Sequence, residues 1–260
     1  MKSLKLFLAK KILTLAVLFS FALLSINLNA QDEEESFILS LTEFTVKPGH
    51  DFEFREGIKA WKDCYLENGG EWSWTIWRRV QGEGNVYILS SSMSSWAEMD
   101  ETGDEAGKEC RDMSRELINP HIEKAKYNLA RYMPEMSKTE PMEYDVVWVT
   151  NWTVNDGDKF RGTVNEITDI IRDVEGDPRG FWYGVMGGAV DEADYFVVDP
   201  YKNFAAMDED RDGVWTLVEK SKGEKKKDEL RQNFLDSVDE AWAYMYTREK
   251  ELSRPSPEDE

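Results

Sequence analysis

The stretch Thr42–Val46, with the sequence TEFTV, decides the fold because it returns later in the chain as TNWTV, Thr150–Val154. The two stretches lie 150 − 42 = 108 residues apart. The same offset matches further residues along the chain: Gly49 with Gly157, Phe52 with Phe160, Trp74 with Trp182, Tyr87 with Tyr195, and Met99 with Met207. A constant offset over such a length indicates an internal duplication. The chain is therefore predicted to contain two copies of one structural unit.

The first thirty residues have the pattern of an export signal. An apolar run, residues 12–26, precedes the small-residue cleavage pattern Leu28-Asn29-Ala30, and the run is too short to span a membrane comfortably. Its positive start contains Lys2, Lys5, Lys10 and Lys11. We expect cleavage after Ala30, a secreted or periplasmic mature protein, and no membrane anchor in that mature form.

The mature chain is strongly acidic. Removal of residues 1–30 leaves 260 − 30 = 230 residues, enough for two small domains or one fused pair. It also removes four lysines and no acid, so the formal charge changes from −20 to 28 − 52 = −24. Such a surface repels nucleic acid and anionic lipid, and neither is an expected partner. The simplest consequence of the charge is solubility.

Two cysteines, Cys64 and Cys110, lie in the first copy and have no cysteine counterparts in the second. In an oxidising compartment such a pair suggests one disulfide, and two buried free thiols are the alternative. No nearby CxxC or histidine cluster completes a metal site around them.

Hydrophobic periodicity gives both copies the order strand, helix, strand, strand, helix. In the first copy we predict strands over 37–46, 71–80 and 85–91, helices over 50–66, 94–100 and 105–128, and either a short strand or a helix end at 131–134. In the second copy we predict strands over 145–154, 180–186 and 195–198, and helices over 158–174, near Asn203 and over 228–251. The final helices align at an offset of 116, which places an eight-residue insertion between Asp212 and Asp228.

This order is that of a ferredoxin-like unit, so the predicted class is α+β. One such sheet is covered by helices on one face only, yet the first strand is apolar on both faces. The second copy would supply the missing cover. The predicted division is a signal peptide over 1–30, a first unit over 31–137, a linker over 138–144, a second unit over 145–253, and a disordered tail over 254–260.

The openings of the two copies, SLTEFTVKPGHDFEF from Ser40 and VTNWTVNDGDKF from Val149, combine with this duplicated order. Together they resemble the dimeric α/β barrel superfamily, which includes NIPSNAP-like proteins, antibiotic-biosynthesis monooxygenases, EthD-like proteins and stress-responsive barrel proteins. The resemblance implies two tandem ferredoxin-like units that form an intrachain pseudo-dimeric α/β barrel with helices outside. It also implies that Cys64 and Cys110 lie close together, where the first helix ends and the second begins.

The resemblance bears on haem as well. The tandem-barrel haem enzymes of this architecture use a proximal histidine in their second unit, and residues 138–260 contain none. Haem is therefore not expected.

An acidic loop in the second copy matches the EF-hand spacing D-x-D-x-D-G-x5-E. The residues that would hold calcium are Asp208, Asp210, Asp212 and Glu219. The alternative is an acidic helix-capping loop, because Asp208 has a counterpart in Asp100 of the first copy. Calcium is thus a candidate ligand, and no other cofactor is expected.

The ten tryptophans favour a core packed with aromatic rings, and an aromatic-lined cavity for a flat or apolar ligand is the alternative. Members of the resembled superfamily place a few polar groups in such cavities. Strand position makes the candidates here Glu43, Arg78, Asn151, Tyr183 and Tyr195.

These observations favour a protein that binds a small apolar or aromatic molecule, or one that serves as an interaction module of the cell envelope. The alternative is a cofactor-independent oxygenase or isomerase acting on an aromatic substrate in the barrel. The sequence assigns no catalytic residue and leaves the oligomeric state open.

Overall fold

The computed structural model describes residues 36–100, 104–187 and 191–255. The predicted export signal, residues 1–30, lies outside them. Among the described residues, no helix has both the length and the apolar character needed to cross a membrane.

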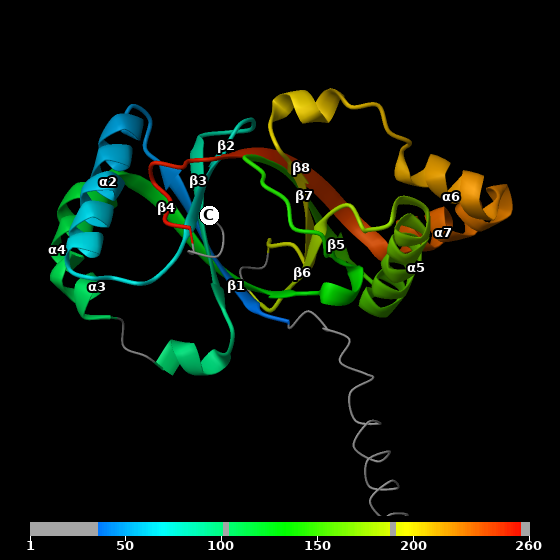
Figure 1. The fold of residues 1–260 in the computed structure, drawn as a ribbon, viewed down its shortest axis with the longest axis horizontal. Helices are drawn as coiled ribbons and strands as arrows, with labels where there is room; N and C mark the ends of the chain where they lie inside the picture. The colour runs from blue at the N-terminus through cyan, green and yellow to red at the C-terminus, as the bar shows by residue number, and fades with distance from the viewer. Residues whose placement is uncertain (1–35, 101–103, 188–190, 256–260) are drawn as a thin grey trace, which may run out of the picture. The chain divides into compact units, whose positions relative to one another are not determined.

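The described strands close into an antiparallel barrel in the order β1-β3-β2-β8-β5-β7-β6-β4 (Figure 1). Their bounds are β1 Ile38–Val46, β2 Thr75–Arg79, β3 Asn85–Met93, β4 Ile122–Tyr132, β5 Val146–Val154, β6 Phe181–Val185, β7 Tyr195–Tyr201 and β8 Val238–Arg248. Each half has the ferredoxin-like order, β4-β1-β3-β2 in the first and β8-β5-β7-β6 in the second. The halves meet where β2 pairs with β8 and where β4 pairs with β6. The predicted fold class is confirmed.

Helices cover the outside of the barrel, with α2, α3 and α4 on one side and α5, α6 and α7 on the other (Figure 1). The helices are α2 Asp51–Glu67, α3 Glu105–Glu109, α4 Arg111–Met113, α5 Gly157–Glu175, α6 Val214–Lys222 and α7 Glu224–Ser237. Short single-turn helices are η1 Trp96–Asp100, η2 Ser114–Ile118, η3 Asn119–His121, η4 Pro134–Met136 and η5 Phe204–Asp208. The ends of α5 follow its sequence: Asp156 caps the first turn by accepting the Lys159 amide at 3.0 Å, and Gly176 ends the helix with φ +91°.

The predicted helix over 105–128 is wrong in its second part. Helical turns end at His121, directly after Pro120, and the chain continues as the eleven-residue strand β4. Every second residue of this strand, including Lys126, Asn128 and Ala130, pairs with inward-facing positions of β1. A period of two residues, which is that of a strand, therefore fits this segment better than the helical period.

The same error occurs in the second half, where the predicted helix over 228–251 ends at Ser237 and β8 follows. The aromatic residues Trp242, Tyr244 and Tyr246 recur at every second position, which is the period of a strand. Val238 does correspond to Ile122, because each begins the last strand of its half. The predicted insertion is occupied by α6, which packs against α5 and α7 through Leu217 and Val218.

Aromatic side chains fill the layer between the barrel and its helices. In the first half Phe54, Tyr65 and Trp74 belong to one buried cluster, and in the second half Phe160 and Trp182 belong to another. The sequence match of Phe52 with Phe160 does not carry into this layer, because the Phe52 side chain is 70% exposed and Phe54 is fully buried. Helix α2 is therefore shifted by two residues relative to that alignment.

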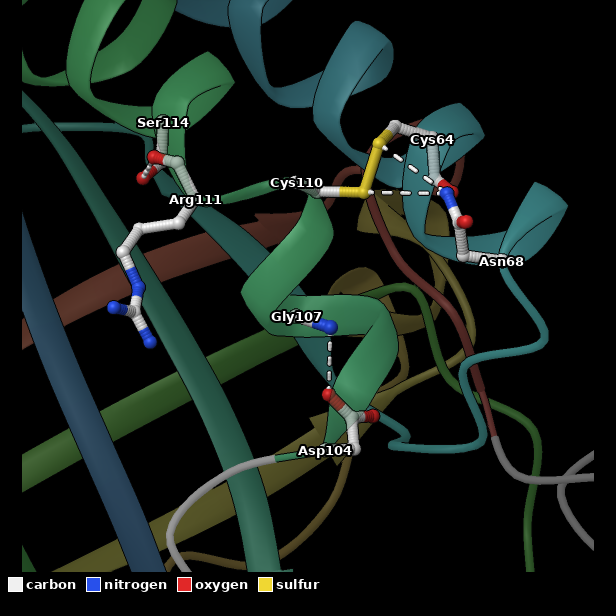
Figure 2. The surroundings of a disulfide bond; sticks show 7 residues. All are labelled: Cys64, Asn68, Asp104, Gly107, Cys110, Arg111 and Ser114. Atoms are coloured by element: carbon white, nitrogen blue, oxygen red, sulfur yellow. Dashed lines mark hydrogen bonds between the residues drawn. A yellow bond between two sulfur atoms is a disulfide. The ribbon is translucent and has the colours of Figure 1, made fainter.

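The close approach of the first-half helices depends on Gly57. A β-carbon at this position would lie 2.1 Å from the carbonyl oxygen of Leu117, so a larger residue would push α2 away from η2. A disulfide also links α2 to the helical segment that packs against it. Cys64 of α2 is bonded to Cys110 at the end of α3, with 6.0 Å between their α-carbons (Figure 2). The Asn68 amide nitrogen lies 3.7 and 3.8 Å from the two sulfur atoms (Figure 2).

The predicted linker, 138–144, is tied to the second half by Asp177. Its carboxylate accepts hydrogen bonds from the Lys138 ammonium, from the backbone and hydroxyl of Thr139 at 2.9 Å each, and from the Glu140 amide at 3.2 Å. Burial alone would raise the pKa of Asp177, but these hydrogen bonds outweigh it and the pKa is lowered.

The segment that follows β8 returns to the first half. Leu252 is fully buried in the cluster around Trp74, and the Trp74 indole donates to the Leu252 carbonyl at 2.9 Å. Arg254, where the predicted tail begins, pairs with Trp74 through two backbone hydrogen bonds of 2.8 and 2.9 Å. The ordered chain thus extends beyond the predicted start of the tail.

Candidate functional site

The barrel encloses a cavity of about 430 Å³. Because side chains of a strand alternate between its two faces, each strand sends every second residue into this space. The apolar part of the wall is formed by Leu39, Leu41, Val147, Val149, Phe196 and Val198. A polar part of similar extent contains the charged residues Glu43, Arg79, Lys126, Asp191 and Glu192. A concave space that combines apolar side chains with polar groups is the usual form of a small-molecule site.

Three of the five predicted ligand residues line this cavity, namely Glu43, Asn151 and Tyr183. The other two, Arg78 and Tyr195, do not line it. Arg78 faces the helical layer, where its guanidinium carbon lies 6.0 Å from the centre of the Tyr87 ring. Tyr195 also faces outward and stacks on Phe160 of α5 at 4.9 Å.

In each case the adjacent residue faces the cavity: Arg79 in place of Arg78, and Phe196 in place of Tyr195. The sequence held the needed signal, since a residue two positions from Trp77 must share its face. Strand position alone does not decide which face that is. Lys126 and Tyr246 also line the cavity, and both lie in segments predicted as helices.

The tryptophans divide between the two layers. Trp74 and Trp182, the repeated pair, lie in the helix-facing clusters and do not line the cavity. Trp77 and Trp242 do line it. Both interpretations of the aromatic content therefore apply, each to different residues.

A charged group lies where β1 and β4 run side by side. Glu43 and Lys126 are register partners on these strands, and Lys126 donates to Glu192 at 2.8 Å. The same Glu192 accepts from the Asn128 amide at 3.2 Å. The hydrogen bond that Lys126 donates to Glu192 raises the pKa of Lys126, and Glu43 adds to the effect through its charge. Lys126 is consequently a fixed cation at neutral pH.

Glu43 itself is different, because no hydrogen bond or ion pair joins its carboxylate to any residue that the structure describes. A carboxylate with free acceptor sites, placed on the wall of an apolar cavity beside a lysine, can accept a hydrogen bond or a proton from a ligand.

Two tyrosines can donate hydrogen bonds, whereas Glu43 can accept them. Burial raises the pKa of Tyr183 and, together with the charge of Glu43, the pKa of Tyr246. Both phenols therefore stay protonated and can donate. No described residue is hydrogen-bonded to either hydroxyl. The cavity wall thus offers two donors from tyrosine and one acceptor from Glu43.

The predicted calcium ligands are not brought together. Asp212 binds Lys220 at 2.6 Å, and Glu219 binds Lys227 at 2.9 Å. Asp208 ends η5, and α6 begins at Val214, directly after the loop. Within the described ranges, no group of three or more His, Cys, Asp or Glu side chains is placed to hold a metal ion. Lysine side chains bind two of the four carboxylates that an EF-hand would use, so the structure does not bring the predicted calcium ligands together.

No protein-family model and no curated protein matches this sequence. Solved structures do match. A candidate monooxygenase from Lactobacillus acidophilus aligns with a TM-score of 0.52 at 13% identity, over 85% of this chain and 97% of that one. A candidate monooxygenase from Fusobacterium nucleatum aligns with a TM-score of 0.49 at 13% identity, over 86% and 96% of the two chains. A haem-binding protein from Thermus thermophilus aligns with a TM-score of 0.46 at 12% identity, over 84% and 93%.

At such identities the likeness concerns the fold alone. The chain has the fold of the dimeric α/β barrel superfamily, with two tandem ferredoxin-like halves in one polypeptide.

The resemblance noted in the sequence raises the question whether this cavity could hold haem. The described residues of its lining include no His, Cys or Met. The two histidines of the chain, His50 and His121, lie elsewhere and face each other with 2.8 Å between their Nδ1 atoms. Tyrosine can ligate iron only as the phenolate, and burial disfavours that form for Tyr183 and Tyr246. The residues present do not fit axial ligation of haem.

Proposed function

We propose that the protein binds a small apolar or aromatic molecule inside the barrel, after export to the periplasm or the medium. The observation that carries this proposal is the cavity of about 430 Å³, whose wall combines apolar and aromatic side chains with the unpaired groups of Glu43, Tyr183 and Tyr246. A cavity that served packing alone would be filled, since interiors are close-packed and buried polar groups normally have partners.

Export is supported by two independent features. The sequence of residues 1–30 has the charge and apolar pattern of a signal peptide. A disulfide such as Cys64–Cys110 persists in oxidising compartments.

The experiment for ligand binding fills the cavity. Val149→Trp places an indole inside the barrel, and Val174→Trp, on the exposed face of α5, adds the same side chain outside it. The mature chain and both variants are titrated with 2-naphthamide, and binding is followed by isothermal titration calorimetry. We expect binding to the mature chain and to Val174→Trp, and none to folded Val149→Trp. Equal binding to all three proteins would show that the ligand does not enter the barrel.

A second function has one specific observation in its favour, the free carboxylate of Glu43 beside Lys126. In a cofactor-independent oxygenase, Glu43 would accept the proton of an aromatic hydroxyl, and Asn151 and Lys126 would stabilise the anion that forms. The fold likeness to a candidate monooxygenase is consistent with this chemistry. Glu43→Gln should then abolish oxygen uptake with a phenolic substrate while the bound fraction of that substrate stays within about twofold. If Glu43→Gln loses binding of the phenol and the parent protein consumes no oxygen, the oxygenase function is contradicted and only ligand binding remains.

A further inference from the structure

A second cavity, of about 940 Å³, adjoins the first. Thr75, Trp77 and Tyr144 line both of them. The Trp77 and Tyr144 rings are parallel within 8° and have centroids 5.9 Å apart. The two spaces therefore share an aromatic wall, and a ligand held in the barrel can extend along it.

The charge of this second cavity is opposite to that of the molecule. Its charged lining residues are the cations Lys62, Lys202, Arg248 and Lys250 and the carboxylates Glu143 and Asp145, a balance of 4 − 2 = +2. The whole chain carries a formal charge of −20. Lys250 and Asp145 neutralise each other at 2.6 Å. Three cations and one carboxylate remain without an ion pair.

Arg248 is the most unusual of these cations. It lies opposite Trp77 in the pairing of β8 with β2. No side-chain hydrogen bond or ion pair joins its guanidinium to any described residue. In the part of the chain that the structure describes, two buried side-chain nitrogen or oxygen atoms have no hydrogen-bond partner, and the Arg248 Nε is one of them. The residue as a whole is half-buried, but a buried N–H without a partner is costly, so this Nε points to a missing acceptor.

The other two cations add charge around the same space. Lys62 donates only to backbone carbonyls, those of Glu251 at 3.1 Å and of Ser253, and burial lowers its pKa. The Lys202 ammonium forms no ion pair with a described residue. Both lysines are cations, so neither can be the missing partner of Arg248.

We infer that the molecule bound in the barrel carries a carboxylate, and that Arg248 binds this group in the second cavity. The inference deepens the proposed function and rests on it. The planar fork of a guanidinium matches the two oxygens of a carboxylate, and Lys202 adds attraction from the rim of the cavity. The apolar or aromatic body of the ligand lies against Trp77 and Tyr144 and enters the barrel. The ligand class is an aromatic carboxylic acid.

The test compares two probes of the same shape, 2-naphthoate and its neutral analogue 2-naphthamide, by calorimetry with the mature chain. We expect the carboxylate to bind about tenfold more tightly than the amide at low salt. Arg248→Met should remove this preference, because the partner of the carboxylate is lost. Glu143→Gln should increase it, because a competing negative charge is lost from the lining. Circular dichroism establishes that both variants are folded.

The outcomes distinguish the carboxylate inference from the proposed function on which it rests. Equal affinity of the mature chain for the two probes overturns the carboxylate inference and leaves ligand binding in the barrel intact. A preference that survives Arg248→Met also overturns it, because the anion is then held elsewhere. Failure of both probes to bind contradicts the proposed function as well.

Discussion

Reduction of the Cys64–Cys110 disulfide should cost the protein a large part of its stability. The bond closes a loop with a sequence separation of 46 residues. In the chain-entropy description, a cross-link removes about 2.1 + 1.5R ln n cal/mol/K from the entropy of the unfolded chain, which for a loop of this length is about 4 kcal/mol at 25 °C. A typical domain has only about 5–15 kcal/mol in total.

The assay is urea unfolding of the mature chain, followed by tryptophan fluorescence, with and without dithiothreitol. We expect the reductant to lower the free energy of unfolding by about 4 kcal/mol. The double variant Cys64→Ala/Cys110→Ala is the control, because dithiothreitol has no bond to break in it. A reductant effect below about 1 kcal/mol in the parent chain would refute the reasoning, since the unfolded chain would then gain little freedom.

Two further predictions concern packing and charge. Phe54→Ala should lower the free energy of unfolding by about 3–5 kcal/mol, because Phe54 is fully buried. Phe52→Ala should lower it by at most about 0.5 kcal/mol, because Phe52 is 70% exposed. Both values are measured by urea unfolding, and the reverse order would mean that the sequence alignment places α2 correctly. Asp177→Asn should destabilise the protein by about 1–2 kcal/mol at neutral pH. The hydrogen bonds of Asp177 outweigh its burial and lower its folded pKa, so its stabilisation is present above the unfolded pKa of about 3.9 and is lost as the pH falls through the lower folded value. The gap between parent and variant in urea unfolding should therefore narrow as the pH falls below about 3.9, and a gap independent of pH would contradict the role assigned to the charge.

The sequence predicted the architecture because the repeat at Thr42–Val46 and Thr150–Val154 marks equivalent strands. These stretches end β1 and β5, which occupy the same position in their halves. The order of elements and the helix ends at Asp156 and Gly176 also follow from local chemistry that survives folding. Such signals depend on few neighbours in space, which is why they can be interpreted without a structure.

The last strand of the first half could not be recognised in the same way. Ile122–Tyr132 contains Lys124, Lys126 and Ala130, residues with little preference for strands, and its pairing with β1 and β6 imposes the extended form. Tertiary pairing thus overrode local preference.

The candidate site was predicted only in part for a related reason. Position within a strand identifies a residue, but the side on which it lies depends on the register of the closed barrel. Glu43, Asn151 and Tyr183 face the cavity, and Arg78 and Tyr195 face the helices. The carboxylates of the acidic loop satisfied a metal pattern in spacing, but nearby lysines bind two of them.

The return of the chain after β8 makes the first half depend on the second. Leu252, which belongs to the second half by sequence, completes the buried cluster around Tyr65 and Trp74 of the first. A gene encoding the first half alone would produce a polypeptide with a hole in its interior and an unpaired Trp74 indole. The first half alone therefore lacks a residue that its own buried cluster needs.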